Sequence, residues 1–240
     1  MPRKARFILP HIPHHTIQRG NNRQNIFFEH EDFDYFLKKL KQFSLENGVQ
    51  IGSYCLMTNH IHLLTYPDTA AGMIKCMKLI CQHYTQYVNR KYKRTGKLWE
   101  NRYKSHWVDP ESEWILARYI EKNPLRAGMV RRAEDYSYSS ARRNLWGNKD
   151  GLISREIVTE PRRPGYRKFF HEDDFKEKQL TQDINLRVEQ GKAFGSESFI
   201  MKLSDLLGIS AAYRKRGRPK KKQTVFFEPQ KFQNGLKMQV

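Results

Sequence analysis

The chain has few cysteines, no long hydrophobic run and little negative charge. Only Cys55, Cys76 and Cys81 occur in 240 residues, and none has a CxxC spacing, which argues against a disulfide framework or a zinc cage. No uncharged apolar run approaches the roughly 18 residues that a membrane span needs. The basic start, MPRKARFILPHIPHH, is too interrupted by proline for a signal peptide. These absences predict a cytoplasmic protein without a membrane partner.

Positive charge is what the chain has in excess. There are 44 Lys and Arg residues against 25 Asp and Glu, which gives a formal net charge of +19. Such an excess favours a polyanionic partner, most simply nucleic acid. Hydrophobic residues make up 38% and aromatic residues 12%, which is enough to build a core.

The spacing of apolar residues predicts an α+β fold. Strands are expected at 11–18, 49–57, 60–66 and the end of 98–108, and helices at about 30–46, 70–92 and 109–123. Asp109 and Pro110 suit the start of the third helix, and Asn123-Pro124 is expected to close it. The order strand–helix–strand–strand–helix–strand is that of a ferredoxin-like antiparallel sheet with packed helices.

Changes in composition divide the chain into four parts. A compact domain is expected at 1–150, followed by a linker rich in Arg and Pro at 151–171. A small helical unit is expected at 172–208, where an apolar stripe follows Ser196, and a basic tail at 209–240. The last two parts form a small helical and basic C-terminal extension.

His60-Ile61-His62 is the sharpest local feature. Residues two apart on a strand point to the same face, so both imidazoles could reach one cation while Ile61 packs into the core. The alternative is a pair of half-exposed histidines on a sheet surface. Neither CxxC nor HExxH lies nearby to decide between these interpretations.

Tyr119 and Asn123 form a second pair, four residues apart on the third predicted helix. This spacing projects a phenol and an amide from one face. The alternative is a core tyrosine and an asparagine that caps the helix end. Together with His60 and His62, the amide oxygen could hold a divalent cation such as Mg²⁺ or Mn²⁺, and Tyr119 could attack phosphorus. Activation of the phenol is left open between the metal, water and Lys122.

Four segments carry a family resemblance: MTNHIHLL (57–64), GNNRQNIFF (20–28), LWENRYKSHWVD (98–109) and YIEKNPLRAGMV (119–130). They closely resemble the REP-associated tyrosine transposases, which belong to the single-tyrosine HUH transposases (IS200-like). The resemblance covers residues 1 to about 145 densely and continues through AFGSESFIMKLSDLLG and KRGRPKKK.

The resemblance implies the HUH endonuclease fold, with His60 and His62 as metal ligands and Tyr119 as nucleophile. Asn123 sits where the third ligand usually projects, a position that is often Gln in related transposases. The implied activity is nicking and rejoining of single-stranded DNA near imperfect palindromic hairpins, through a 5′-phosphotyrosine and a free 3′-OH. No nucleotide cofactor is implied, and the setting is the bacterial cytoplasm, at the nucleoid. Related transposases act as homodimers with swapped helices, whereas REP-associated members can act as monomers.

Basic and amide side chains are expected to hold the DNA. In the loops near the proposed site these are Arg19, Asn22, Arg23, Arg102 and Lys104. In the tail they are Arg214, Lys215, Arg216, Arg218, Lys220, Lys221 and Lys222. The segment 216–220 resembles an AT-hook, which inserts into the minor groove; the alternative is a solvated tail of non-specific affinity. Interleaved aromatic residues could stack on bases or pack in the core, namely Tyr92, Trp99, Tyr103 and Trp107.

The sequence thus favours a metal-dependent endonuclease and strand transferase for single-stranded DNA. The main alternative is a domesticated protein that binds hairpins without moving DNA. An RNA-processing phosphoesterase would want a second histidine motif, which the chain lacks. Initiation of rolling-circle replication uses similar chemistry, but the match along the chain favours the transposase branch.

Overall fold

A four-stranded antiparallel sheet forms the centre of the structure, a computed structural model that describes residues 7–172 and 177–208. Its strands are β1 (His14–Arg19), β2 (Val49–Met57), β3 (His60–Pro67) and β4 (Lys104–Trp107), in the order β2-β3-β1-β4. Helix α1 (His30–Glu46) connects β1 to β2, and α2 (Ala70–Lys91) connects β3 to β4. The predicted ferredoxin-like α+β fold is confirmed.

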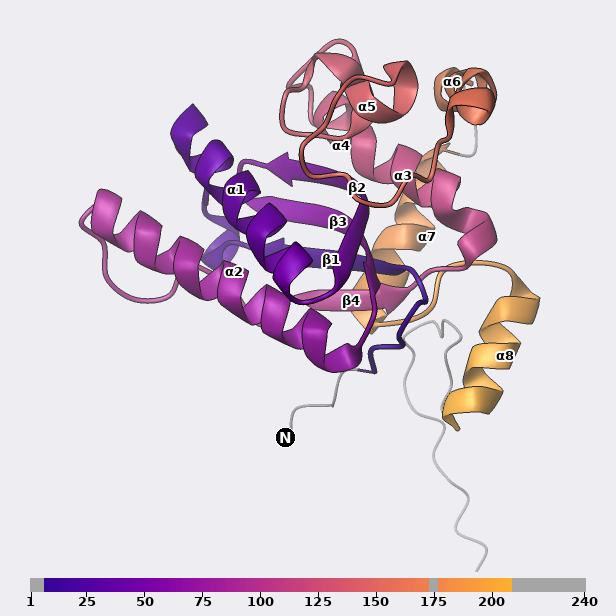
Figure 1. Cartoon of the computed structure of the whole chain (residues 1–240), viewed down its shortest axis with the longest axis horizontal. Helices are drawn as coiled ribbons and strands as arrows, with labels where there is room; N and C mark the ends of the chain where they lie inside the picture. Colours follow the sequence, from indigo (N-terminus) through magenta and orange to yellow (C-terminus); the bar gives the residue numbers. More distant parts are fainter. Residues whose placement is uncertain (1–6, 173–176, 209–240) are drawn as a thin grey trace, which may run out of the picture.

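Helices α1 and α2 lie side by side on one face of the sheet (Figure 1). A capping box between Glu29 and Asp32 starts α1, and the Thr69 hydroxyl accepts the Gly72 N–H at the start of α2. Both helices bury an apolar stripe at helical spacing against Ile61 and Leu63 of β3. This is the larger of the hydrophobic cores.

The opposite face of the sheet carries α3 (Glu113–Glu121) and α7 (Glu177–Gln190). A short 3₁₀ turn, η2 (Pro110–Ser112), leads into α3, and the Asp109 carboxylate accepts the Glu111 N–H there. Helix α3 ends at Glu121, two residues before the expected boundary. Asn123-Pro124 does not close the helical segment, because Lys122 keeps a helical backbone conformation and α4 follows directly. Pro124 sits in the first turn of α4 (Asn123–Arg126), where its missing N–H has no cost.

The segment predicted as a linker, 151–171, contains the 3₁₀ turn η4 (Glu160–Arg162) and the helix α6 (Arg163–His171). Tyr166 and Phe170 of α6 are buried in the same cluster as Ile120 of α3. The Arg- and Pro-rich composition hid this aromatic pair at helical spacing, so the structure differs from the linker interpretation.

Short elements complete the described residues. They are η1 (Asn21–Arg23), η3 (Ala133–Asp135), α5 (Ala141–Trp146) and α8 (Glu197–Leu207). Ser196 caps α8 by accepting the Phe199 N–H, and Gly208 ends it in the left-handed region. Within residues 7–172 and 177–208, no helix combines the length and apolar character needed to cross a membrane.

Candidate active site

The structure brings His60 and His62 together on the sheet face that α3 covers. Their ring centroids are 4.9 Å apart and the rings lie edge to face. In the pairing of β3 with β1, His60 lies opposite Arg19 and His62 opposite Ile17. Strand alternation therefore turns both imidazoles away from the core formed by α1 and α2.

Each of these two rings is oriented by a hydrogen bond at Nδ1. His60 Nδ1 lies 2.5 Å from Asn59 Oδ1, and His62 Nδ1 lies 2.9 Å from Nε2 of His15. Burial lowers the pKa of His60 to about 4, with a contribution from Arg19, and lowers the pKa of His62 well below its usual value. Both rings are thus neutral at pH 7, and each keeps Nε2 for a ligand, as in histidines that bind metals.

Two further histidines on this face were not identified from the sequence. His15 stacks on His62 with centroids 5.2 Å apart, and His106 of β4 lies 6.1 Å from His15. Both rings are buried, and burial lowers the pKa of His15 to about 3. Strand alternation in β1 and β4 could have placed His15 and His106 on one face of their strands. Only the strand register, which pairs His15 with His106, shows that the two rings lie close together.

Tyr119 of α3 packs its ring edge-on against the same histidines. The centroid lies 5.8 Å from His62 and 5.8 Å from His15. Only 5% of Tyr119 is exposed, and its hydroxyl donates a 2.8 Å hydrogen bond to Oδ1 of Asn185 in α7. The phenol therefore lies at the histidine pair, with its hydroxyl bound to a neighbouring helix.

Two arginines counteract the effect of burial on this phenol. Burial raises the pKa of Tyr119, while Arg126 and Arg19 lower it, and the balance lies above the usual value. The Arg126 guanidinium sits 4.7 Å from the ring centroid and donates to the carbonyl of Tyr119. Lys122, which the sequence left open as a base, places Nζ 5.5 Å from the centroid of the Phe170 ring, on α6.

Asn123 uses its amide nitrogen to close the end of α3. Nδ2 donates to the carbonyls of Tyr119 and Ile120, both at 3.0 Å. The helix-capping interpretation is thus correct for the amide nitrogen. The amide oxygen, Oδ1, is the atom of Asn123 that could bind a cation. Among the described residues, no group of three or more His, Cys, Asp and Glu side chains forms a metal site. Two imidazoles and one amide oxygen are donor types that suit a divalent cation with retained water. The contacts of Asn123 run to the backbone of α3 rather than to His60 or His62.

Glu121 fixes the helix that carries Tyr119. Its carboxylate is fully buried, and burial raises its pKa against the effect of its hydrogen-bond donors. Four side chains from three other segments donate to it: Ser140 (2.6 Å), Asn144 (2.6 Å), Tyr166 (2.9 Å) and Ser53 (3.2 Å). This network joins α3 to β2, α5 and α6, and it therefore fixes the position of the helix backbone that carries Tyr119.

Three of the predicted DNA contacts converge beside the site. Arg19, Arg102 and Lys104 line a small cleft of about 120 Å³ at the β1–β4 edge, next to Val188 of α7. Asn22 and Arg23 are exposed on the loop between β1 and α1, and both have left-handed backbone conformations (φ of 50° and 58°). The predicted contacts of the tail, 214–222, lie outside the described residues.

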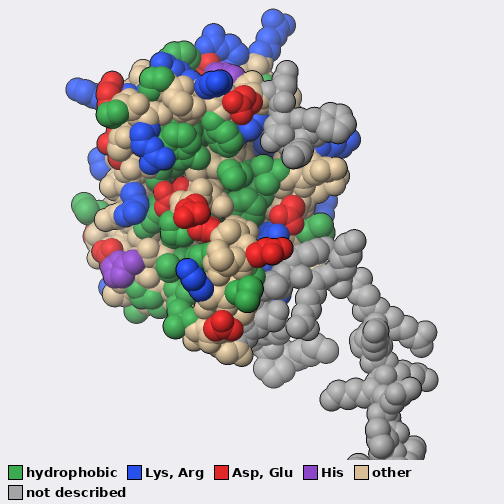
Figure 2. Space-filling view, turned by 90° about the vertical axis from the view of Figure 1, so that its right-hand side faces the viewer, with side chains coloured by type: hydrophobic (Ala, Val, Ile, Leu, Met, Phe, Trp, Pro, Cys, Tyr) green, Lys and Arg blue, Asp and Glu red, His purple; other side chains and the backbone are tan. Residues whose placement is uncertain are grey.

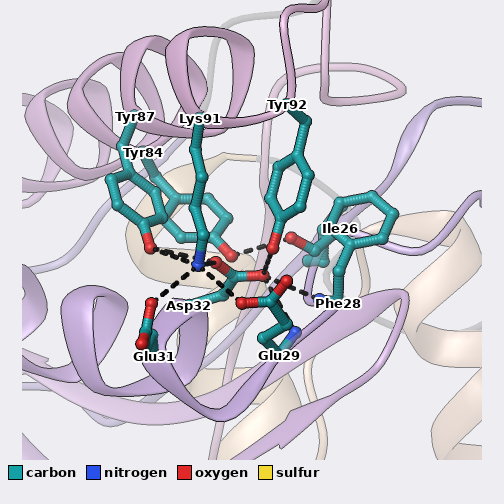
Figure 3. A network of polar contacts seen from close by, with 9 residues as sticks. All are labelled: Ile26, Phe28, Glu29, Glu31, Asp32, Tyr84, Tyr87, Lys91 and Tyr92. Atoms are coloured by element: carbon teal, nitrogen blue, oxygen red, sulfur yellow. Dashed lines mark hydrogen bonds and ion pairs between the residues drawn. The ribbon is translucent and has the colours of Figure 1, made fainter.

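A polar network anchors the far end of that loop (Figure 3). The Asp32 carboxylate accepts hydrogen bonds from the Phe28 N–H (2.9 Å), the Lys91 ammonium (3.0 Å) and the Tyr92 hydroxyl (2.8 Å). Burial raises the pKa of Asp32, but these donors outweigh it and the pKa is lowered. Tyr84 also donates to the carbonyl of Ile26 at 2.7 Å. Residues 26–32 are thereby bound to α2 and to Tyr92 just after it, which fixes where the loop that carries Asn22 and Arg23 ends.

The interleaved aromatic residues mostly pack rather than face solvent. Tyr103 and Trp107 are buried, and Trp99 is half-buried and donates Nε1 to the Cys81 carbonyl at 3.0 Å. The face turned to the right in Figure 1 is also not uniformly basic. Figure 2 shows acidic and hydrophobic side chains over its middle and Lys and Arg nearer its margins. This face therefore presents mixed charge rather than one continuous basic surface.

Comparison with known proteins finds similarity to transposases. Residues 9–123 match the family model described as "Transposase IS200 like". Among solved structures, the chain is similar to a REP-associated tyrosine transposase bound to a REP hairpin, with 14% identity over 66% of this chain and 94% of that one and a TM-score of 0.49. It is also similar to a putative transposase from Deinococcus radiodurans R1, with 19% identity over 50% and 97% of the two chains and a TM-score of 0.35. No curated protein matches the chain.

Proposed function

We propose that the chain, whose residues 9–123 match the model of the IS200-like transposases, cleaves and rejoins single-stranded DNA beside a palindromic hairpin. Tyr119 is the nucleophile, and His60, His62 and the amide oxygen of Asn123 hold a divalent cation, Mg²⁺ or Mn²⁺. The observation that carries the proposal is the contact of the Tyr119 ring with His62, 5.8 Å between centroids. The nucleophile comes from α3 and the ligands from β3 and α4, so β3 meets two helices that lie far from it in the sequence.

The bound cation supplies Lewis-acid stabilisation of the charge that develops on the scissile phosphate. The residues of the chain perform the remaining tasks. His15 and Asn59 hold the two ligand imidazoles in one orientation, and Arg126 and Arg19 favour the ionised phenol. Arg19, Arg102 and Lys104 neutralise phosphates of the strand that enters beside α7.

The reaction is a transesterification. The Tyr119 oxygen forms a bond to phosphorus, and the bond from phosphorus to the 3′ oxygen of the preceding nucleotide breaks. The departing oxygen keeps the bonding electron pair and takes a proton, which gives a free 3′-OH, while the phenolic proton passes to water. A second strand's 3′-OH reverses the step, so the phosphotyrosine bond conserves the energy of the original diester.

An adduct assay tests the proposal. The protein is mixed with Mn²⁺ and a labelled single-stranded hairpin, and a denaturation-resistant species is measured. We expect an adduct with the natural chain, none with Tyr119→Phe or after chelation, and at least a tenfold decrease with His60→Ala or His62→Ala. An undiminished adduct in Tyr119→Phe would reject the assigned nucleophile.

The same assay addresses the alternative of a hairpin-binding protein without transfer activity. The low exposure of Tyr119 and its bond to Asn185 are the observations that favour that alternative. Hairpin binding without an adduct, in the presence of metal, would support it.

A further inference from the structure

A second basic site lies at the β2 edge of the sheet. The β2-edge cleft is a hollow of about 380 Å³ between α1, the segment 136–143 and the loop 148–152. Five cationic side chains line it: Lys38, Lys41, Arg142, Arg143 and Lys149. Two come from α1, and the other three come from α5 and the loop directly after it, about 100 residues later in the sequence; the fold places α1 and α5 near β2 (Figure 1).

The positive charge of this cleft is largely uncompensated. Of the five cations, only Arg143 pairs with a described carboxylate, that of Glu156 at 2.9 Å. Asp150 is the single acid in the lining, and its oxygens accept the Tyr54 hydroxyl (2.9 Å) and the backbone N–H groups of Leu152 and Ile153. Like charges that line a concave surface repel one another and produce a strong positive potential inside it. An anion bound in the cleft relieves this repulsion, so its binding is electrostatically favourable.

The cleft is separate from the site of Tyr119 but close to it in the sheet. Tyr54, which lines the cleft, faces the core under α1, whereas its neighbour Cys55 lies in the same cluster as Tyr119. Cys55 is the direct pairing partner of His62. The cleft therefore lies one strand from His62, around the β2 edge, while the cleft of Arg19, Arg102 and Lys104 lies at the β1–β4 side.

We propose that the β2-edge cleft binds backbone phosphates of the paired stem of the DNA while the unpaired strand lies at Tyr119. The ligand class follows from the lining, because lysine and arginine side chains bind phosphate oxygens as point charges and as forks. Two separated basic regions match a substrate that has a paired and an unpaired part. This inference rests on the proposed function for the identity of the substrate.

The test compares two variants of the full chain with equal loss of charge. The cleft variant carries Lys41→Gln and Lys149→Gln, and the control carries Lys75→Gln and Lys78→Gln, exposed positions on α2. Affinity is measured between 50 and 200 mM salt, roughly the range over which phosphate contacts change affinity most visibly, for a hairpin with an unpaired 5′ flank and for the flank alone.

For the hairpin, we expect the cleft variant to bind about tenfold more weakly, with a log–log salt slope reduced by about 2, and the control to bind like the natural chain. For the flank alone, all three proteins are expected to bind equally. Equal hairpin affinities of the cleft variant and the control would overturn the inference.

Two added measurements distinguish stem binding from a small-anion site and from a failure of the proposed chemistry. The first is a calorimetric titration with inorganic phosphate; saturable binding that the cleft variant loses, together with equal hairpin affinities, would overturn the assignment to DNA. The second is the adduct assay, run in parallel. A selective loss of hairpin binding without any adduct would reject the proposed chemistry and leave the cleft assignment standing.

Discussion

His14 shows how a single buried side chain makes stability depend on pH. It lies on β1, fully buried, with Nδ1 3.0 Å from Ser105 Oγ and Nε2 3.1 Å from the Leu9 carbonyl. Burial lowers its pKa to about 4, although the Leu9 carbonyl acts in the opposite direction. In the unfolded chain the pKa is about 6.5, so between these values the unfolded state binds more protons than the folded state.

The contribution of neutral His14 to the free energy of unfolding is therefore fully present above pH 6.5, and it is lost as the pH falls towards 4. His14 alone accounts for a loss of up to about 3 kcal/mol in the free energy of unfolding over that range. Urea unfolding of the natural chain and of His14→Gln, from pH 7.5 to about 4.5, measures the effect. The variant is expected to show a shallower pH dependence, and identical dependences would contradict this account.

The residues of the site were predictable to different degrees. Alternation on a strand placed His60 and His62 on one face, and helical spacing placed Tyr119 and Asn123 on another. His15, Arg126 and Asn185 could not be assigned in the same way. Their partners depend on strand register and on how α4 and α7 pack, and neither property is local in the sequence.

At the scale of elements, the buried Glu121 network predicts a large effect of one truncation. Glu121→Ala leaves four buried donors without their acceptor, so we expect the free energy of unfolding to fall by about 3–5 kcal/mol. Glu46→Ala, at an exposed position on α1, is the matched control and is expected to change it by less than about 0.5 kcal/mol. Chemical denaturation compares the two. Similar losses in both variants would show that the network does not hold α3.

Helix α7 provides a second prediction at this scale. The hydrogen bond from Tyr119 to Asn185 stabilises the neutral phenol. In the proposed reaction this bond has to break before the phenol oxygen attacks. A bond worth about 1 kcal/mol predicts an adduct rate about fivefold higher in Asn185→Ala. Gln182→Ala, exposed on the same helix, is the control. Single-turnover adduct formation measures both, and a rate at or below that of the natural chain would argue against this role of α7.

The elements up to α3 followed from apolar spacing and capping residues, and β2 and β3 begin where the sequence predicts. Helix α6 did not, because a basic, Pro-containing segment resembles a linker until its partner surface is known. Tyr166 and Phe170 become core residues only through α3 and Glu121. Long-range packing, rather than local propensity, decides such a segment.

At the scale of the whole molecule, the net charge of +19 is expected to dominate affinity for DNA. Removal of 209–240 takes away the seven basic residues of 214–222. We expect the log–log salt slope of DNA binding to fall by about 3, with the chemical step at saturating DNA unchanged. Filter binding over a salt series measures the slope. An unchanged slope would mean that this segment makes no phosphate contacts.

The placement of the nucleophile is the central claim, and the mass of the DNA-linked peptide tests it most directly. Trypsin cleaves after Arg118 and Lys122, so the predicted adduct is the peptide 119–122, Tyr-Ile-Glu-Lys, carrying a 5′-phosphorylated oligonucleotide. The account predicts that this peptide holds the DNA after nuclease and tryptic digestion. DNA attached to a peptide that lacks Tyr119 would contradict it.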